Sequence, residues 1–323
     1  MRGVDVKQYF VGIDLGGTNM KIGLVHQNGN VIKDIEKPTL KEEGPDGVIR
    51  RMVRHTQDLA QEARVPWEEI GGVGVGLPGF LDIPGGVVKY LTNLGWRDVP
   101  IRDQLESAFG VPVKIDNDAN VAALGEVWAG AGAGEQNVVL ITLGTGVGGG
   151  IIAGGKLLHG ARGIAGEIGH IPIDPDGVLC NCGRAGCLET IASATGMVRL
   201  VREAVEAGET SSLVLPLQNG TLSTKEIFAE AEKGDSLAKT TVERAVDALA
   251  RAMAILSVVV NPSLFIIGGG VSKAGDALLK PLENHYRKQV QQNAGQGVRI
   301  ELARLGNQAG FIGAAGLLAR TRK

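Results

Sequence analysis

Runs of apolar residues separated by short polar or glycine-containing turns predict how the chain begins. Residues 9–25, YFVGIDLGGTNMKIGLV, predict two strands joined at Gly16-Gly17-Thr18. The NGN triplet at residues 28–30 is typical of a hairpin turn into a third strand. The chain is therefore expected to open with an antiparallel meander of three strands.

Helical periodicity follows the meander. Apolar side chains recur at helical spacing between residues 47 and 64, which predicts a helix. A buried strand is expected in IGGVGVGLPG (70–79), a second helix in IRDQLESAF (101–109) and a further strand in VPVKI (111–115). The first third of the chain thus predicts a meander that continues as alternating helices and strands.

The same layout begins again at residues 138–155, VVLITLGTGVGGGIIAGG. Leu143-Gly144-Thr145-Gly146 corresponds there to Leu15-Gly16-Gly17-Thr18. A long helix is expected over 236–260, with Asp235 as its N-cap and Asn261-Pro262 as its end, followed by a buried strand in SLFIIGGG (263–270). Two related α/β halves are predicted, with a ligand-binding cleft between them.

Length, charge and composition limit the classes of protein that this chain can belong to. A chain of 323 residues is long enough for about two domains. With a net charge of -2 and no long runs of charged residues, the sequence shows no basic region suited to bind nucleic acid or an anionic membrane. We found neither a membrane-length apolar run nor a signal peptide, so we expect a cytoplasmic protein.

Glycine-rich turns are the candidate phosphate-binding elements. No glycine-lysine pair is followed by Ser or Thr, which excludes a Walker A loop, and GTGVGG (144–149) runs into a strand instead of a helix, which excludes a dinucleotide fingerprint. The two hairpin turns expose backbone N–H groups suited to phosphate oxygens, and Asp14 can hold a magnesium ion through water. The alternative is that both are ordinary tight turns.

All three cysteines lie in one short stretch with a histidine nearby. His170, Cys180, Cys182 and Cys187 supply the ligands of a tetrahedral zinc site. Four protein ligands leave no open position, so the zinc is expected to be structural; a redox pair at Cys180 and Cys182, or inert buried thiols, is the alternative.

Three carboxylates are further candidates. Glu167 and Glu189 flank the metal ligands, and zinc would fix them relative to one another for hydrogen bonds to a hydroxylated ligand, whereas their ordinary role is that of solvated surface charges. Asp118 stands at the start of a helix expected to begin near Ala119. It is suited either to accept a proton or to serve as a plain helix cap, and the sequence pattern leaves both open.

Taken together, DLGGTN, LGTGVGGG, NDAN, GEIGH and C-x-C-G-x-x-G-C-x-E resemble the ROK family of sugar kinases, and within it the glucokinase branch, over nearly the whole chain. The resemblance implies an actin-like ATPase (ribonuclease H-like) fold, a duplicated α/β architecture of two domains with a cleft between them. It assigns residues 1–117 and 305–323 to a small domain, and 118–304 to a larger domain with the zinc loop and the nucleotide-binding turns.

The resemblance also implies partners and residue roles. ATP would phosphorylate the 6-hydroxyl of glucose with magnesium present, in a protein that forms a homodimer. Asp118 would be the catalytic base. The sugar would contact Gly79, Asn117, Asp118, Glu167, His170 and Glu189, and the nucleotide would contact Asp14, Gly16, Gly17, Thr18, Thr145, Gly146, Gly268 and Gly269.

Two alternatives stay open beside glucose phosphorylation. The sugar can instead be N-acetylmannosamine, N-acetylglucosamine, fructose or allose. A sugar-sensing repressor is disfavoured, because only about eight residues precede the first strand and no basic patch is present. Since the zinc loop and the nucleotide turns are separate in sequence, loosening the loop is expected to weaken sugar binding and to leave nucleotide affinity nearly unchanged.

Overall fold

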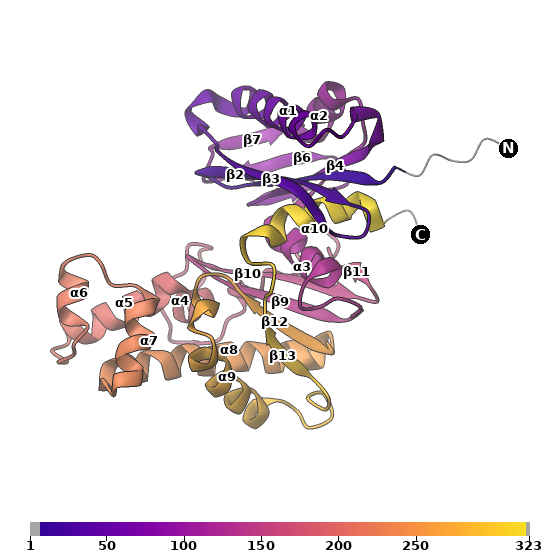
Figure 1. The fold of residues 1–323 in the computed structure, drawn as a ribbon. Coiled ribbons are helices and arrows are strands. Elements are labelled where there is room, and N and C mark those ends of the chain that lie inside the picture. The colour runs from indigo at the N-terminus through magenta and orange to yellow at the C-terminus, as the bar shows by residue number, and fades with distance from the viewer. Residues whose placement is uncertain (1–6, 321–323) are drawn as a thin grey trace.

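The computed structural model of the protein describes residues 7–320, and its two five-stranded sheets lie in separate layers (Figure 1). The first sheet has the order β3-β2-β1-β4-β8. The expected meander forms its antiparallel part, and β4 and β8 extend it in parallel. The strands are β1 (Tyr9–Leu15), β2 (Asn19–His26), β3 (Val31–Pro38), β4 (Ile70–Leu77) and β8 (Val113–Asn117).

The second sheet, of order β11-β10-β9-β12-β13, repeats this plan. Its hairpin β9–β10 corresponds to β1–β2, and β12 pairs in parallel with β9 as β4 does with β1. The predicted duplication of the α/β layout is therefore confirmed. The strands are β9 (Val138–Leu143), β10 (Val147–Ala153), β11 (Lys156–Leu157), β12 (Leu264–Gly268) and β13 (Arg299–Leu302).

Helices cover the outer faces of both sheets (Figure 1). The first sheet carries α1 (Gly44–Glu62) and α2 (Ile101–Phe109), together with a small antiparallel sheet that the sequence analysis did not predict, made of β5 (Phe80–Asp82), β6 (Val87–Leu91) and β7 (Trp96–Val99). The second sheet carries α4 (Glu189–Ala192), α5 (Ala194–Glu206), α6 (Val214–Gln218), α7 (Thr224–Lys233), α8 (Ser236–Val259) and α9 (Asp276–Gln289). No helix among residues 7–320 has the length and apolar character needed to span a membrane.

The long helix α8 begins and ends where its sequence signals place it. The Asp235 side chain accepts a hydrogen bond from the backbone N–H of Ala238 at 2.9 Å, which satisfies one of the free donors of the first turn. Past the other end, Asn261 adopts a left-handed backbone with φ of 46°, and Pro262 follows. Both predicted ends of the helix are therefore confirmed.

Two helices, α3 (Asp118–Ala129) and α10 (Ala309–Ala319), lie between the sheets and pack against each other (Figure 1). Their backbones approach so closely that a Cβ at Gly313 would lie 1.6 Å from the carbonyl oxygen of Val121. On its other side α10 lies against the first sheet, where a Cβ at Gly74 would lie 1.8 Å from the carbonyl oxygen of Ala314. The chain passes between the sheets at β8–α3 and again between β13 and α10.

We predict that Gly313→Ala lowers the free energy of unfolding by about 2 kcal/mol or more, because the added methyl group forces the two helix backbones apart. Gly316→Ala is the matched control. It lies on the same helix, and its added Cβ would meet the ring of Trp128 at 3.0 Å and no backbone atom nearer than that. Urea unfolding of both variants measures the difference, and equal effects would contradict the close backbone contact.

Candidate active site

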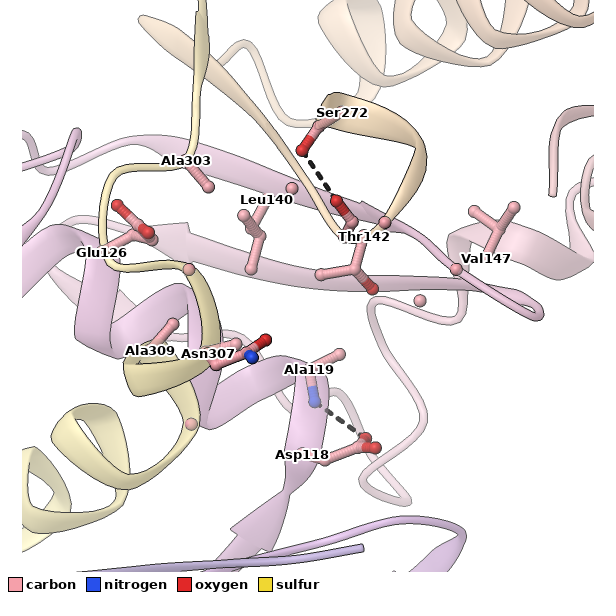
Figure 2. A pocket seen from close by; sticks show the side chains of 18 of the residues that line it. Asp118, Ala119, Glu126, Leu140, Thr142, Val147, Ser272, Ala303, Asn307 and Ala309 are labelled. Atoms are coloured by element: carbon pink, nitrogen blue, oxygen red, sulfur yellow. Dashed lines mark hydrogen bonds between the residues drawn. The ribbon is translucent and has the colours of Figure 1, made fainter. Parts of the chain in front are cut away.

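A cavity of about 700 Å³ opens where α3, the start of α10 and the glycine turns of the second sheet meet (Figure 2). Side chains from both sheets line it. Asp14 and Lys21 come from β1 and β2, and Thr142 comes from β9. The cavity is therefore shared between the two halves of the molecule, as expected for a ligand cleft.

The structure brings part of the predicted nucleotide set into this cavity. Asp14, Gly146, Gly268 and Gly269 line it. Thr145 instead lines a neighbouring pocket of about 470 Å³ between α5 and the start of α7. The turn Gly16–Thr18 contributes no lining residue to either space.

Several lining residues were not predicted from the sequence, among them Lys21 and Asn307. Lys21 pairs directly with Asp14 across β1 and β2, so it brings a positive charge to the same end of the cavity. Asn307 projects into the cavity from the segment just before α10 (Figure 2). The alternation of polar and apolar residues in DLGGTNMK could have indicated Lys21 as a polar strand residue near Asp14. No pattern in the neighbouring sequence marks Asn307 as a site residue.

Asp14 is partly exposed near the end of β1 and touches the first turn of α10. A Cβ at Gly310 would lie 2.5 Å from its Oδ2 atom, so a side chain there would displace the carboxylate. Burial raises the pKa of Asp14, and the positive charge of Lys21 opposes this shift.

Asp118 is the first residue of α3, and the cap of this helix is its neighbour. The Asn117 side chain accepts hydrogen bonds from the backbone N–H groups of Ala119 at 2.9 Å and Asn120 at 3.4 Å. Asp118 Oδ1 also accepts from the Ala119 N–H at 2.8 Å, and its carboxylate lines the cavity (Figure 2). The helix therefore begins one residue earlier than expected, and Asn117 fills the capping role that the sequence left open for Asp118.

The environment of Asp118 raises its pKa to about 6. Burial is the main cause, the negative charges of Asp14 and Glu167 add to it, and the hydrogen bond from the Ala119 N–H opposes it. A carboxylate that titrates near neutral pH is ionised at physiological pH and yet basic enough to accept a proton from a hydroxyl group.

Of the predicted sugar contacts, Asp118 and Glu189 line the cavity, whereas Gly79, Asn117, Glu167 and His170 do not. Glu167 is near enough to contribute to its raised pKa, and His170 Nε2 lies 3.9 Å from Glu167 Oε2. Glu189 starts α4 and its Oε2 accepts a hydrogen bond from the backbone N–H of Val147 at 3.0 Å. Gly79 lies in the turn between β4 and β5 with φ of 95°, where a Cβ would lie 2.5 Å from the carbonyl oxygen of Tyr90.

The ligand atoms of His170, Cys180, Cys182 and Cys187 all lie within 4.8 Å of one another. The sulfur atoms of Cys182 and Cys187 are 3.6 Å apart, and Cys180 Sγ is 3.7 Å from His170 Nδ1. A tetrahedral zinc ion with bonds of about 2.3 Å separates neighbouring sulfur ligands by about 3.8 Å. The residues therefore fit zinc, with His170 Nδ1 facing the thiols and its Nε2 facing Glu167.

Known proteins have sequences and folds similar to those of this chain. The sequence pattern that defines the ROK family matches residues 10–321. The chain belongs to the ROK family. A glucokinase from Halalkalibacterium halodurans is 42% identical over 96% of this chain and 95% of its own. A xylose repressor from Caldicellulosiruptor bescii is 29% identical over 94% of this chain and 76% of its own.

A solved structure supports the assignment of this chain to the ROK family. The crystal structure of a ROK family glucokinase from Streptomyces griseus, in complex with glucose and AMPPNP, matches with a TM-score of 0.78 and 34% identity, over 97% of this chain and 99% of that one. The fold is therefore the actin-like ATPase fold of the ROK hexokinases, and the resemblance in the sequence motifs is confirmed.

The raised pKa of Asp118 predicts a pH-dependent stability effect. A carboxyl group whose pKa is 3.8 when unfolded and about 6 when folded contributes stability that is fully present below pH 3.8 and is lost as the pH rises through 6. We expect Asp118→Asn to stabilise the protein by about 2 kcal/mol at pH 7.5, and by less than half of that at pH 4.5.

Urea unfolding at the two pH values measures this gain. Asp276→Asn, at the exposed first turn of α9, is the control and should show no such pH-dependent gain. If Asp118→Asn destabilises the protein at pH 7.5, the carboxylate is not in the environment described here.

Proposed function

We propose that the protein is an ATP-dependent hexokinase that transfers the terminal phosphoryl group of ATP to the 6-hydroxyl of glucose. The observation that carries the proposal is the position of Asp118, a carboxylate with a pKa of about 6 that lines the glycine-lined cavity together with Glu189 and lies near Glu167. Membership of the ROK family and the glucokinase relatives support the same activity.

The nucleotide is proposed to occupy the 700 Å³ cavity. Its phosphates would lie against the backbone at Gly146 and its adenosine against Gly268 and Gly269. The other predicted phosphate contacts, Gly16–Thr18 and Thr145, lie outside the lining of this cavity and would be reached only by phosphates that extend beyond it. Asp14 would hold magnesium through water, and that ion would offset the charge of the phosphates. Lys21, paired with Asp14 across the hairpin, adds a positive charge at the same end.

The sugar is proposed to lie on the other side of Asp118. Glu167 and Glu189 would accept hydrogen bonds from its hydroxyl groups, and Asn117 has an amide Nδ2 to donate, since its Oδ1 caps α3. Gly79 would let the backbone of the β4–β5 turn approach the sugar. With zinc bound to Nδ1, which faces the thiols, His170 would carry a proton on Nε2 and could donate it to a hydroxyl oxygen.

In the transfer step Asp118 would accept the proton of the 6-hydroxyl as that oxygen forms its bond to the terminal phosphorus. The bond from this phosphorus to the bridging oxygen breaks, and ADP leaves. Most of the rate enhancement in such a reaction comes from positioning and charge stabilisation, so a base of moderate strength is sufficient. A pKa of about 6 places Asp118 in its ionised form at pH 7 and above.

A sugar-sensing regulator is the second candidate, because a xylose repressor is among the relatives of this chain. Both candidates use the same sugar contacts, but only the kinase needs Asp118 as a base. Turnover therefore separates them. We also keep the homodimer as a proposal, since cyclic dimers are the commonest symmetric assembly.

We predict that kcat/KM, measured as ADP release with ATP and magnesium, is higher for glucose than for N-acetylglucosamine, N-acetylmannosamine, fructose or allose. Asp118→Asn should lower kcat by ~10² to 10⁴, and the control Asp276→Asn should keep wild-type turnover. A higher kcat/KM with another sugar would refute the glucose assignment, and no turnover with any sugar would favour the regulator.

The cysteine cluster predicts one zinc per chain, measured by elemental analysis of protein purified without added metal. Cys182→Ser should lose zinc and weaken glucose binding more than binding of a non-hydrolysable ATP analogue, because the loop carries His170 and Glu189. Asp176→Asn, an exposed position on the same loop, is the control. Wild-type protein that is active without zinc would contradict the proposal.

A further inference from the structure

A contact between a buried carboxylate and a partly exposed histidine joins the two segments that carry the proposed sugar-binding residues. Asp116, on β8, is 1% exposed, and its Oδ2 lies 2.7 Å from Nε2 of His159. His159 lies beyond β11, in the loop that leads to Glu167. Neither Asp116 nor His159 lines the cavity or belongs to the zinc cluster.

On one side, Asp116 is hydrogen-bonded to the segment at the junction of β8 and α3 that carries Asp118. The second oxygen of Asp116, Oδ1, accepts hydrogen bonds from the backbone N–H of Asn117 at 2.8 Å and from the Asn120 side chain at 2.9 Å. Asn120 is itself buried in the first turn of α3. Both oxygens of Asp116 are therefore in use, and any movement of this carboxylate moves the start of α3.

On the other side, His159 anchors the base of the loop that ends in Glu167. Its carbonyl oxygen accepts a hydrogen bond from the backbone N–H of Ala165 at 3.1 Å, which closes residues 159–165 into a turn. The backbone N–H of Glu167 in turn bonds to the carbonyl oxygen of Ile164 at 3.4 Å. The position of the Glu167 backbone is thus linked to that of His159 through two short hydrogen-bonded steps.

The charges explain why a histidine stands at this position. Asp116 brings a buried carboxylate into a region that already contains Asp118 and Glu167, and a buried charge without a partner is strongly destabilising. The hydrogen bond and the charge of Asp116 raise the pKa of His159, while burial opposes the shift. The imidazole thereby gives the buried carboxylate a hydrogen-bonding partner and fixes the loop in the same contact.

We propose that His159 is a positioning residue for the sugar site, which acts through Asp116 to hold the Glu167 loop in a fixed place relative to Asp118. The proposal rests on the proposed function for its catalytic consequence. It adds a second support to the site, since zinc links His170 to the cysteine loop and this ion pair links Glu167 to β8.

His159→Gln tests the proposal, because glutamine keeps a hydrogen-bonding side chain but carries no charge. A positioning group displaced by about 1 Å can cost ~10²-fold in rate, so we expect kcat/KM for glucose to fall by about 10- to 100-fold. The KM for ATP should change by less than about threefold, since the pair touches no lining residue of the cavity except through α3.

The chain offers a matched control in His285→Gln. His285, on α9, is also a partly buried histidine paired with carboxylates, at 2.8 Å from Glu243 and 3.2 Å from Asp247 of α8, but it lies away from the cavity and the metal cluster. A general loss of stability from breaking such a pair would appear in both variants. A loss in glucose kcat/KM should appear only in His159→Gln.

A double-mutant cycle tests whether the two residues act as a unit. Asp116→Asn keeps the shape of the side chain and an oxygen that accepts from Asn117 and Asn120, but the amide Nδ2 that would face His159 donates instead of accepting. Its combination with His159→Gln replaces the ion pair by two neutral amides. We expect the double variant to have a glucose kcat/KM no lower than that of the worse single variant, because the buried unpaired charge is gone. Losses that multiply would overturn the proposal.

Hydrogen–deuterium exchange measures the positioning without reference to catalysis. We expect faster exchange in residues 159–168 of His159→Gln and unchanged exchange in the zinc loop at 178–188. Unchanged exchange in 159–168, or equal losses for glucose and ATP, would overturn the proposal. If the wild-type protein phosphorylates no sugar, the proposed function fails, and the exchange experiment still decides whether His159 fixes the loop.

Discussion

The structure depends on the close contact of α3 and α10 between the two sheets. Glycine at 125 and 313 lets the helix backbones touch, since a Cβ at Gly125 would lie 2.3 Å from the carbonyl oxygen of Ala309. Buried Glu126 adds hydrogen bonds from the backbone N–H groups of Ala131, Arg304 and Leu305. Because Asp118 begins α3 and the start of α10 touches Asp14, this contact sets the distance between the two carboxylates of the cavity.

The site gains its chemistry at the cost of stability. Burial, Asp14 and Glu167 all oppose the ionisation of Asp118, and the ionised form is the one that can accept a proton. Such an arrangement persists only if the surrounding structure holds the like charges in place. The hydrogen bond from Ala119, the capped start of α3 and the Asp116–His159 pair supply this support from the protein side.

Local signals in the sequence predicted the parts of the fold that depend on neighbouring residues. The strand meander, the glycine turns, the capped helix α8 and the cysteine cluster each lie within a short stretch of chain. Contacts between distant residues left no such signal. Asp116 and His159 are 43 residues apart, and the sheet β5–β7 forms from strands too short to show a clear alternation. The glycines of α10 are likewise explained only by the distant backbones that pack against them.

Glu189 shows how such a distant contact changes the interpretation of the site. In the sequence the zinc loop and the glycine turn of β9–β10 are separate, and we expected them to act separately. In the structure one oxygen of Glu189 lies 3.8 Å from Cys180 Sγ, and the other accepts the backbone N–H of Val147 beside the turn. A Cβ at Gly146 would lie 2.2 Å from the same carboxylate, so a side chain there would displace it. A single side chain thus connects the metal cluster to the turn proposed to bind phosphate, so the geometry of the sugar side and that of the nucleotide side are not independent of one another.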